Sequence, residues 1–204
     1  MSRSISFYTV GCRLNQSETA LLESLCREAG FTVVGPLTPA DIFVANSCTV
    51  TSRGDSDTRR AVLRAVRLNP KVRVAVIGCQ AQVQREELLS WPNVRWVIGT
   101  EKKMSLLDIL REGEEGLLAP AVLRRPFVLP ISVSSGARVR AHLKIQDGCD
   151  NSCAYCEIPF ARGPSRSRQF DNLMREAKAL VQAGHREIVI TGVNIGDYSH
   201  EGRG

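Results

Sequence analysis

Three cysteines crowd one short segment of the sequence, "GCDNSCAYCEIPFARG", which spans residues 148–163. Cys149, Cys153 and Cys156 follow the spacing C-x3-C-x2-C, which allows thiolates from one loop to converge on one metal centre. A zinc site needs a fourth ligand, and a ferredoxin-type cluster normally takes four cysteines. Three thiolates therefore predict a cubane iron–sulfur cluster with one iron left open, and an open iron can bind a substrate.

This spacing, directly after an expected strand, resembles the radical S-adenosylmethionine superfamily. The resemblance implies that the open iron chelates the methionine part of S-adenosylmethionine. An electron from the cluster then cleaves the sulfonium and leaves a deoxyadenosyl radical. The alternative is a zinc loop completed by His142 or His185. We expect His142 on a strand face and His185 as a polar residue at a helix end.

A second group of cysteines, Cys12, Cys48 and Cys79, falls within one or two residues of the ends of expected strands. In an open parallel sheet those ends share one edge, where ligands bind. Each cysteine also precedes an expected helix, whose positive N-terminal end lowers a thiol pKa and favours the thiolate. We therefore predict one site, the alternative being three buried cysteines in unrelated places. Cys26 lies in a helix beside leucines and is expected in the core.

Short runs rich in Val and Ile alternate with helical patterns along the first half of the chain. Strands that alternate with helices form parallel sheets, so the pattern predicts an open parallel α/β domain. The expected strands are 4–10, 41–47, 72–78 and 94–99, and the expected helices are 17–29, 55–68, 80–89 and 102–111.

The periodic pattern gives way to Gly, Pro and Ser around residues 112–138, which indicates a linker rather than another βα unit. We predict a first domain over residues 1–112, a linker over 113–137 and a second domain over 138–204. The second domain is expected to hold a strand (139–146), the cysteine loop, a helix (171–183) and a strand (187–192). Gly184 stands where a left-handed helix cap belongs.

Composition limits the classes of protein that fit. The chain has 204 residues with a formal net charge of +6, which favours a polyanionic partner such as nucleic acid. Its seven cysteines are an odd number, and no secretion signal precedes them. Both features argue against a disulfide framework or a disulfide-linked partner and favour a reducing, cytoplasmic compartment. No segment approaches the length of a membrane span.

Five ordered segments together resemble the radical S-adenosylmethionine methylthiotransferases: "TVGCRLNQSE", "ANSCTVT", "IGCQAQ", "GCDNSCAYCEIPFARGPSRSR" and "ITGVNIGDY". The family implies an N-terminal cluster domain, a radical S-adenosylmethionine barrel that is a partial TIM barrel, and a C-terminal RNA-binding domain. It further implies two [4Fe-4S] clusters, an auxiliary one on Cys12, Cys48 and Cys79 and one on the loop cysteines. One S-adenosylmethionine would methylate a sulfur of the auxiliary cluster, and another would form the radical that activates a C–H bond for sulfur insertion.

Residues beside the cysteines resemble one branch of that family, which converts threonylcarbamoyladenosine next to the tRNA anticodon to its 2-methylthio derivative. They are Arg13, Leu14, 49–51 and 192–196. The isopentenyladenosine and ribosomal-protein branches usually show other residues there, and remain the alternatives. Ser47 departs slightly, because a threonine is more usual. The resemblance implies tRNA as substrate and a flavodoxin- or ferredoxin-type electron donor.

Further site residues rest on the same resemblance. It places Tyr155, Thr191, Gly192 and Asn194 beside S-adenosylmethionine, where glycine permits close backbone approach, although a plain turn also fits. Basic side chains are the candidates for phosphate contact. They are Arg162, Arg166 and Arg168 after the loop, and Arg53, Arg59, Arg60, Arg64 and Arg67 along one helix, for which a solvated face is an equal explanation.

Two other functional classes fit the charge and the cysteines. A non-catalytic iron–sulfur or zinc module that binds RNA would not bind S-adenosylmethionine, and an electron carrier would carry four cysteines per cluster. Beyond Arg138 the sequence holds 66 residues, whereas a βα barrel takes about 200 or more. We therefore expect a truncated barrel, and we expect this chain alone not to complete turnover.

Overall fold

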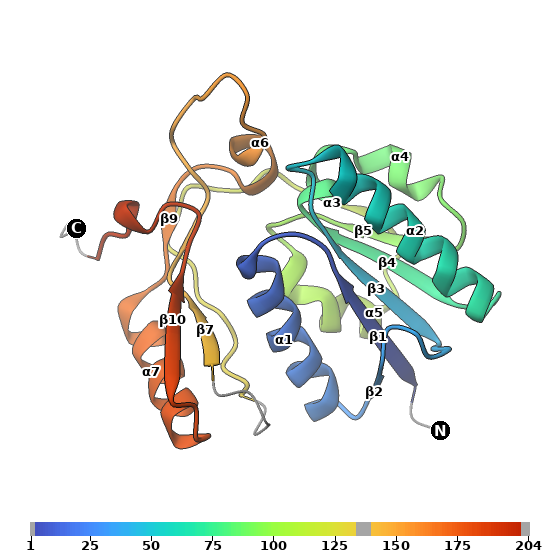
Figure 1. The fold of residues 1–204 in the computed structure, drawn as a ribbon, viewed down its shortest axis with the longest axis horizontal. Coiled ribbons are helices and arrows are strands. Elements are labelled where there is room, and N and C mark those ends of the chain that lie inside the picture. Colours follow the sequence, from blue (N-terminus) through green and yellow to red (C-terminus); the bar gives the residue numbers. More distant parts are fainter. Residues whose placement is uncertain (1–2, 134–139, 201–204) are drawn as a thin grey trace.

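The computed structural model describes residues 3–133 and 140–200, and its largest element is a six-stranded sheet (Figure 1). Every neighbouring pair of strands in it is parallel, which confirms the expected open α/β architecture. The strands, in order across the sheet, are β2 (Thr32–Val34), β1 (Ser4–Thr9), β3 (Ile42–Ser47), β4 (Arg73–Gly78), β5 (Val94–Ile98) and β6 (Gly116–Leu118).

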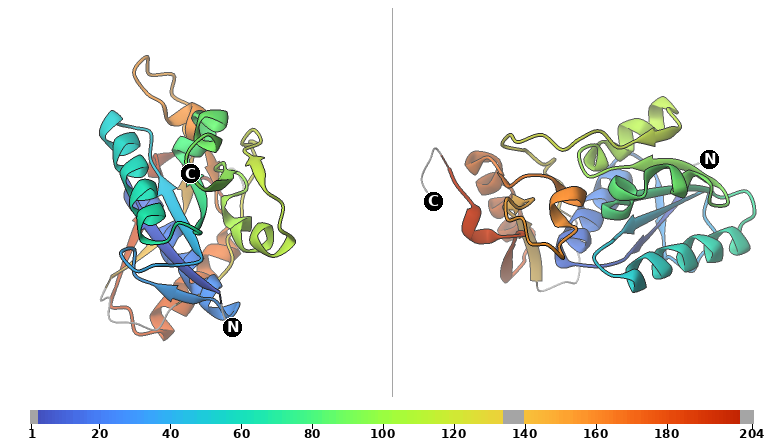
Figure 2. Two further views of the ribbon diagram at one scale, coloured as in Figure 1. Left: turned by 90° about the vertical axis from the view of Figure 1, so that its right-hand side faces the viewer. Right: turned by 90° about the horizontal axis from the view of Figure 1, so that it is seen from above.

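Helices cover both faces of this sheet because its strands are apolar on both sides. Along β3, Ile42 and Val44 enter one core while Phe43 and Ala45 enter the other, as the alternation of side chains requires. Figure 2 shows α2 and α5 on opposite sides of the sheet. One face is covered by α1 (Arg13–Glu28) and α5 (Leu106–Glu112), and the other by α2 (Ser52–Leu68), α3 (Cys79–Val83) and α4 (Arg85–Leu89).

Several boundaries differ from those expected. The segment predicted as a linker contains β6, which pairs with β5 and forms an edge of the sheet. The strands β2 and β6 have three residues each, too few to produce a periodic signal. The predicted helix over 80–89 is two helices, because Arg85, the first residue of the second one, adopts a φ of 35°. The helix α2 begins at Ser52 because the Thr51 side chain caps it, accepting a hydrogen bond from the Gly54 amide.

The second part of the chain forms a parallel βαβ unit, as expected. Strands β7 (Arg140–Lys144) and β10 (Glu187–Thr191) pair in parallel, and α7 (Phe170–Gln182) packs on them over a small core around Leu143 and Leu180. Between β7 and α7 lie β8 (Gln146–Asp147), α6 (Ile158–Arg162) and β9 (Arg166–Ser167), and β10 is followed by the short helix η2 (Ile195–Asp197).

The end of α7 confirms the predicted left-handed residue. Gly184 has a φ of +89°, and its amide donates to the Val181 carbonyl, while the His185 amide donates to the Leu180 carbonyl. This is the hydrogen-bond pattern of a Schellman motif. The predicted boundary between residues 137 and 138 lies outside the described residues. Within the described part, no helix is both long enough and apolar enough to cross a membrane.

The two parts of the chain meet along α1. This helix packs on the first sheet and also contacts β7, so it lies between the two sheets (Figure 1). The cysteine loop stands above this junction, next to the carboxyl ends of the strands of the first sheet (Figure 1). The fold thus brings the two cysteine-bearing regions to one side of the molecule.

Candidate functional site

The structure places Cys12, Cys48 and Cys79, here termed the strand-end triad, at one edge of the first sheet. They follow β1, β3 and β4, which are adjacent strands, and Cys48 and Cys79 come directly after theirs. Cys12 is the residue directly before α1, and Cys79 is the first residue of α3. The topology therefore gathers three residues that are far apart in the sequence, as the strand pattern predicted.

One expectation about these thiols is wrong for Cys48. Burial raises the pKa of its thiol, and the neighbouring Cys79 and Cys12 raise it further. The opposing effects, a hydrogen bond from the Val50 amide and the charge of Arg162, are too small to reverse this. A helix N-terminus lowers a thiol pKa, but desolvation penalises the charged form of a buried group and dominates at Cys48.

Gly11 fits closely against the strand-end triad. Its φ is +100°, and a Cβ added there would lie 2.5 Å from the Cβ and 2.7 Å from the Sγ of Cys48. Any larger residue would displace the Cys48 thiol. The chain therefore crosses this edge of the sheet by a path that only glycine allows, which leaves the Cys48 thiol its place among the strand ends.

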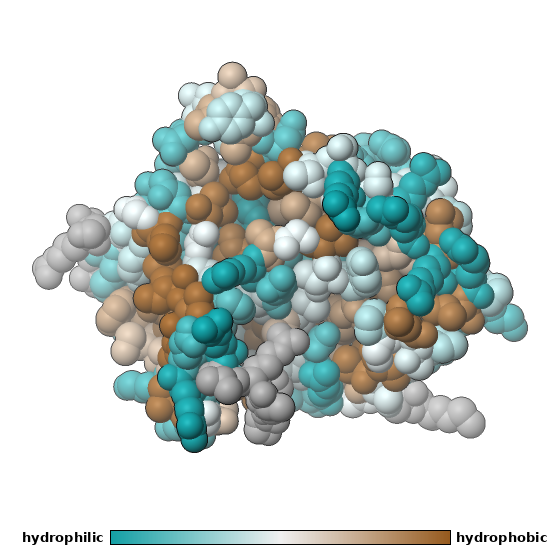
Figure 3. All heavy atoms as spheres, viewed as in Figure 1, coloured by the Kyte–Doolittle hydropathy of each residue, from teal (hydrophilic) through white to brown (hydrophobic). Residues whose placement is uncertain are grey.

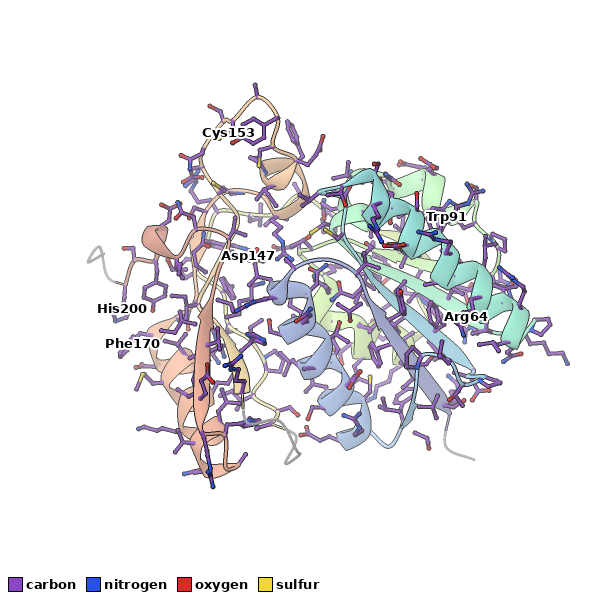
Figure 4. The ribbon with its side chains drawn as sticks, viewed as in Figure 1. Arg64, Trp91, Asp147, Cys153, Phe170 and His200 are labelled. Carbon is purple, nitrogen blue, oxygen red and sulfur yellow. The ribbon has the colours of Figure 1, made fainter. Side chains whose placement is uncertain are left out.

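The loop that follows β8 holds the loop triad, which consists of Cys149, Cys153 and Cys156. Cys153 is exposed and stands at the outer part of the loop (Figure 4), whereas Cys149 and Cys156 are partly buried. The Cys156 amide donates to the Cys153 carbonyl at 3.0 Å, which holds these two residues in a turn. Tyr155 beside them is 90% exposed.

The base of the loop is closed by backbone contacts. Gly148 has a φ of +72°, and a Cβ there would lie 2.0 Å from the carbonyl oxygen of Pro164. The Cys149 amide donates to the Gly163 carbonyl at 3.1 Å. The two ends of the loop therefore run side by side, and only a glycine fits where they cross.

Neither triad forms a site for a single metal ion. Across residues 3–133 and 140–200, no three or more His, Cys, Asp or Glu side chains are grouped so as to hold a metal ion, and neither His142 nor His185 joins the loop cysteines. A cubane differs from a single ion because each thiolate binds a different iron atom. Three thiols on adjacent strand ends, with glycine against one of them, are a donor set that fits such a cluster.

Gln146 joins the loop to the turn after β10, a role that the sequence did not reveal. Its buried Oε1 accepts hydrogen bonds from the amides of Val193 and Asn194, both at 2.9 Å. Its Nε2 donates to the Gly148 carbonyl at 2.7 Å. The available signal was a polar residue at the end of an apolar strand, three positions before Cys149.

Two residues predicted to contact S-adenosylmethionine lie beside Gln146. A Cβ added to Gly192 would lie 3.0 Å from the Gln146 Oε1, and the Asn194 amide donates to the same oxygen. Thr191 is buried at the end of β10, and its hydroxyl has no hydrogen-bond partner among the described residues. The structure thus brings 191–194 to the base of the cysteine loop, while Tyr155 remains on its exposed surface.

Five charged side chains are buried where the two parts meet, and only Arg162 among them is a site residue predicted from the sequence. Each is at most 6% exposed, and they come from α1, the segment before α5, β7, β8 and α6. This junction charge cluster consists of Glu18, Lys103, Lys144, Asp147 and Arg162. Figure 4 shows Asp147 between the two sheets. The cluster links α1, which follows Cys12, to β7, β8 and α6, which flank the loop triad.

Ion pairs connect these residues in a chain. Glu18 receives the ammonium groups of Lys103 at 2.5 Å and Lys144 at 2.7 Å. Asp147 binds Lys144 at 2.6 Å and Arg162 at 2.9 Å. Burial by itself would raise the pKa of both carboxyls, but the surrounding cations hold the pKa of Glu18 and of Asp147 well below their ordinary values. Both therefore stay ionised at neutral pH.

Arg162 extends this network to the strand-end triad. Its Nη2 donates to the Asn15 Oδ1 at 2.6 Å and lies 4.0 Å from the Cys12 Sγ. Burial acts to lower the pKa of Arg162, but Cys79, Glu18, Asp147 and Cys12 together hold it above its ordinary value. The helix α6, which follows the cysteine loop, thus ends in a guanidinium that reaches the other triad.

The burial of two arginines corrects the predicted phosphate contacts. Arg162 and Arg168 are each 1% exposed, and Arg168 binds Asn172 and Glu176. Arg166 is only 9% exposed and pairs with Glu101 at 2.7 Å. The guanidinium groups of Arg162 and Arg168 are buried and hydrogen-bonded inside the protein, so they are not exposed to RNA. The sequence showed their charge but could not show that carboxylates from other segments would enclose it.

The arginines of α2 are on the surface. Arg59, Arg60 and Arg64 are exposed, Arg60 pairs with Asp57 at 2.5 Å, and the Arg59 guanidinium lies 5.9 Å from the centre of the Trp91 ring. The surface over this helix is largely hydrophilic (Figure 3). These side chains are exposed, so a phosphate or solvent can reach them.

Two family models match the chain. Residues 4–99 match the model described as Uncharacterized protein family UPF0004, and residues 143–203 match the Radical SAM superfamily. The chain is therefore similar to UPF0004 proteins over its first part and to radical S-adenosylmethionine proteins over its last part. The first holds the strand-end triad and the second holds the loop triad.

Among curated proteins, the threonylcarbamoyladenosine tRNA methylthiotransferase MtaB of Bacillus subtilis (strain 168) is 38% identical over 97% of this chain and 45% of its own length. MtaB of Aquifex aeolicus (strain VF5) is also 38% identical, over 95% of this chain and 48% of its own length. The ribosomal protein uS12 methylthiotransferase RimO of Desulforudis audaxviator (strain MP104C) is 35% identical over 97% of this chain and 45% of its own length.

These relatives confirm the resemblance to the radical S-adenosylmethionine methylthiotransferases, and the chain spans about half the length of the curated relatives it matches. A solved structure of the radical S-adenosylmethionine methyltransferase TsrM from Kitasatospora setae has a similar fold, with a TM-score of 0.59 at 14% identity. That match covers 96% of this chain and 48% of the TsrM chain. At this identity it supports the fold alone.

Proposed function

We propose that this chain is part of a radical S-adenosylmethionine methylthiotransferase that acts on tRNA, with threonylcarbamoyladenosine next to the anticodon as its target. The observation that carries the proposal is the reach of Arg162 from the loop-triad region to Cys12 of the strand-end triad. Methylthiolation needs two cluster sites that cooperate, and the two triads share one buried junction. The 38% identity to two tRNA enzymes supports tRNA as the substrate.

In this proposal Cys149, Cys153 and Cys156 hold one [4Fe-4S] cluster, and Cys12, Cys48 and Cys79 hold the second. The two clusters with S-adenosylmethionine supply one-electron cleavage chemistry and a sulfur donor. The chain's own residues position these groups. Gln146 orients the turn at Val193 and Asn194 against the loop, and the Thr191 hydroxyl, unpaired within the described residues, is available to a ligand bound there.

The domain organisation follows the same assignment. We propose that residues 1–112 form the auxiliary-cluster domain and that residues 138–204 begin the radical S-adenosylmethionine domain. Residues 113–137 connect the two domains, and β6 within this connection also pairs with the first sheet. A cytoplasmic flavodoxin- or ferredoxin-type protein would deliver electrons near the exposed cysteine loop. The chain by itself would bind S-adenosylmethionine weakly, because the β7–β10 pair has no further strand on either side in the described residues.

For the nucleic acid, we propose contact with the exposed arginines of α2. Binding of unmodified tRNA to the reconstituted chain should weaken steeply with salt, because each neutralised phosphate releases counterions. Replacing Arg59, Arg60 and Arg64 with Gln should flatten the slope of log K against log salt by about 0.7–0.9 for each phosphate that is no longer neutralised. Arg27→Gln, which removes an exposed arginine from α1, is the matched control. An unchanged slope in the triple variant would mean that α2 presents a plain solvated face.

A replacement experiment tests the reaction and its target. This chain would replace the matching region of the Bacillus subtilis relative in cells that lack that relative, and nucleosides and ribosomal proteins would be analysed by mass spectrometry. We expect the 2-methylthio derivative of threonylcarbamoyladenosine, and its loss when Cys12 is changed to Ala. Methylthiolation of isopentenyladenosine or of a ribosomal protein instead would assign the chain to another branch of the methylthiotransferases. A soluble, iron-loaded hybrid without any methylthio product would overturn it.

A further inference from the structure

The junction charge cluster holds more positive than negative charge. Lys103, Lys144 and Arg162 are buried with only two carboxylates, Glu18 and Asp147. The next ion pair, Arg166 with Glu101, adds one charge of each sign, and Glu101 also pairs with Arg125, whose side chain is 64% exposed and faces solvent. The excess in the buried network therefore stays at one cation. A buried charge without a counter-charge is costly, so this excess calls for an anion nearby.

The excess charge faces the strand-end triad. The Nη1 of Arg162 is occupied by Asp147 at 2.9 Å and Glu18 at 3.4 Å, both carboxylates. Its Nη2 has only the neutral Asn15 amide oxygen, at 2.6 Å, and the Cys12 sulfur, at 4.0 Å, among the described residues. The two lysines are engaged by the same carboxylates. The positive charge that remains uncompensated is therefore presented to Cys12.

We propose that Arg162 is a positioning residue for the auxiliary cluster and sets its reduction potential, an inference that rests on the proposed function. An oxidised four-iron cluster bound by three thiolates carries one net negative charge, which matches the one excess cation of the junction. Reduction adds a second negative charge, so a guanidinium beside it favours the reduced state and raises the potential. Arg162 lies at the end of α6, after the loop triad, and its guanidinium links the two cluster sites.

The test uses the full chain with Cys149, Cys153 and Cys156 changed to Ala, reconstituted anaerobically so that only the strand-end cluster reports. Iron content and the EPR-monitored midpoint potential would be measured for this background and for added Arg162→Gln, Arg162→Lys and Arg124→Gln. Arg124 is the matched control because it is 64% exposed and pairs with Asp150 at the surface of the loop. We expect a more negative potential for Arg162→Gln, a smaller shift for Arg162→Lys, and none for Arg124→Gln.

An unchanged potential in Arg162→Gln at full iron content would overturn the inference. If that variant does not fold, Asp147→Asn combined with Arg162→Gln removes one charge of each sign and leaves no carboxylate without its partner. The excess then resides on the lysines, farther along the network from Cys12, so the potential should still become more negative. An unchanged value in the double variant overturns the inference equally. Absence of iron in the background itself would overturn the auxiliary cluster, a failure distinct from that of Arg162.

Discussion

The strand-end triad lies on three adjacent strands of a sheet with helices on both faces, whereas the loop triad lies within eight residues of one loop. In the strand-end triad Cys48 and Cys79 are buried and Cys12 is exposed, whereas in the loop triad Cys153 is exposed and Cys149 and Cys156 are only partly buried. The positions of the first triad follow from two hydrophobic cores and many strand contacts. Those of the second depend on a few anchors at the loop base, chiefly Gln146 and Gly148.

The strand-end triad is also surrounded by a larger apolar core than the loop triad. The first sheet has an apolar core on each face, while the β7–β10 pair has one small core. On β10, Ile190 is 56% exposed, and Figure 3 shows apolar surface gathered over this side of the molecule. A large exposed apolar region marks a surface that associates with something else. The strand-end site is thus framed by this chain, and the loop site only in part.

The largest expected effect comes from removing either triad. Changing Cys12, Cys48 and Cys79 to Ala should abolish one cluster, halve the iron content, and leave the loop cluster able to bind S-adenosylmethionine. Changing Cys149, Cys153 and Cys156 should abolish the other cluster and all binding of S-adenosylmethionine. Iron and sulfide analysis with Mössbauer spectroscopy after anaerobic reconstitution would measure both. Loss of both clusters in either variant would show that the ligand sets are not separate.

A smaller effect is expected from Glu18, which ties the two regions together. Glu18→Gln leaves two buried lysines with less compensation, and breaking a buried ion network in this way costs about 3–5 kcal/mol. Glu23→Gln on the same helix is the control, since its exposed pair with Arg27 contributes about 0.5 kcal/mol or less. Urea unfolding would compare them. Equal free energies of unfolding would mean that the junction is not the buried network described.

Glycine substitutions test how closely the backbone packs against the strand-end triad and at the base of the cysteine loop. Gly11 and Gly30 both have positive φ, so alanine at either costs about 1–3 kcal/mol, but only the Gly11 substitution also meets Cys48, at 2.5 Å. Gly11→Ala should therefore lower the iron held by the strand-end triad, while Gly30→Ala retains it. Gly148→Ala should act in the same way on the loop triad, because its Cβ meets the Pro164 carbonyl. Each glycine variant would be made in a chain from which the other triad has been removed, and its iron content would be measured after reconstitution. Equal losses of iron in Gly11→Ala and Gly30→Ala would contradict the packing explanation.

The smallest effect concerns Cys26, a cysteine of the same α1 that belongs to neither triad. Burial raises the pKa of its thiol to about 11, and Glu23 adds to this rise. The folded state thus favours the neutral thiol, whereas the unfolded thiol ionises near pH 9. The contribution of the neutral Cys26 thiol to the free energy of unfolding is therefore present below pH 9. It is lost between about pH 9 and 11, where the free energy of unfolding falls by no more than about 1.4 kcal/mol per pH unit. Cys26→Ala should show a flatter pH dependence in chemical unfolding, and identical slopes would contradict this assignment.

The sequence by itself determined the parallel α/β class, the order of the main strands and helices, and the association of cysteines with strand ends. These features have local causes, since apolar runs, helix periodicity and turn glycines act over a few residues. It also identified Cys26 as a core residue, which its complete burial confirms. The short strands β2 and β6 were not predicted from the sequence, because three residues are too few to show an alternating hydrophobic pattern.

Only the tertiary structure decided which charges are buried and what they face. Glu18 and Lys144 are 126 positions apart yet lie 2.7 Å from each other, and nothing in the residues near either one indicates the other. The same holds for Arg162, whose positive charge suggested RNA until its partners Asp147 and Asn15 were seen. Charge is a property of a residue and is visible in the sequence. Desolvation and pairing are properties of the folded environment, so the burial of Arg162 beside Cys12 could only come from the structure.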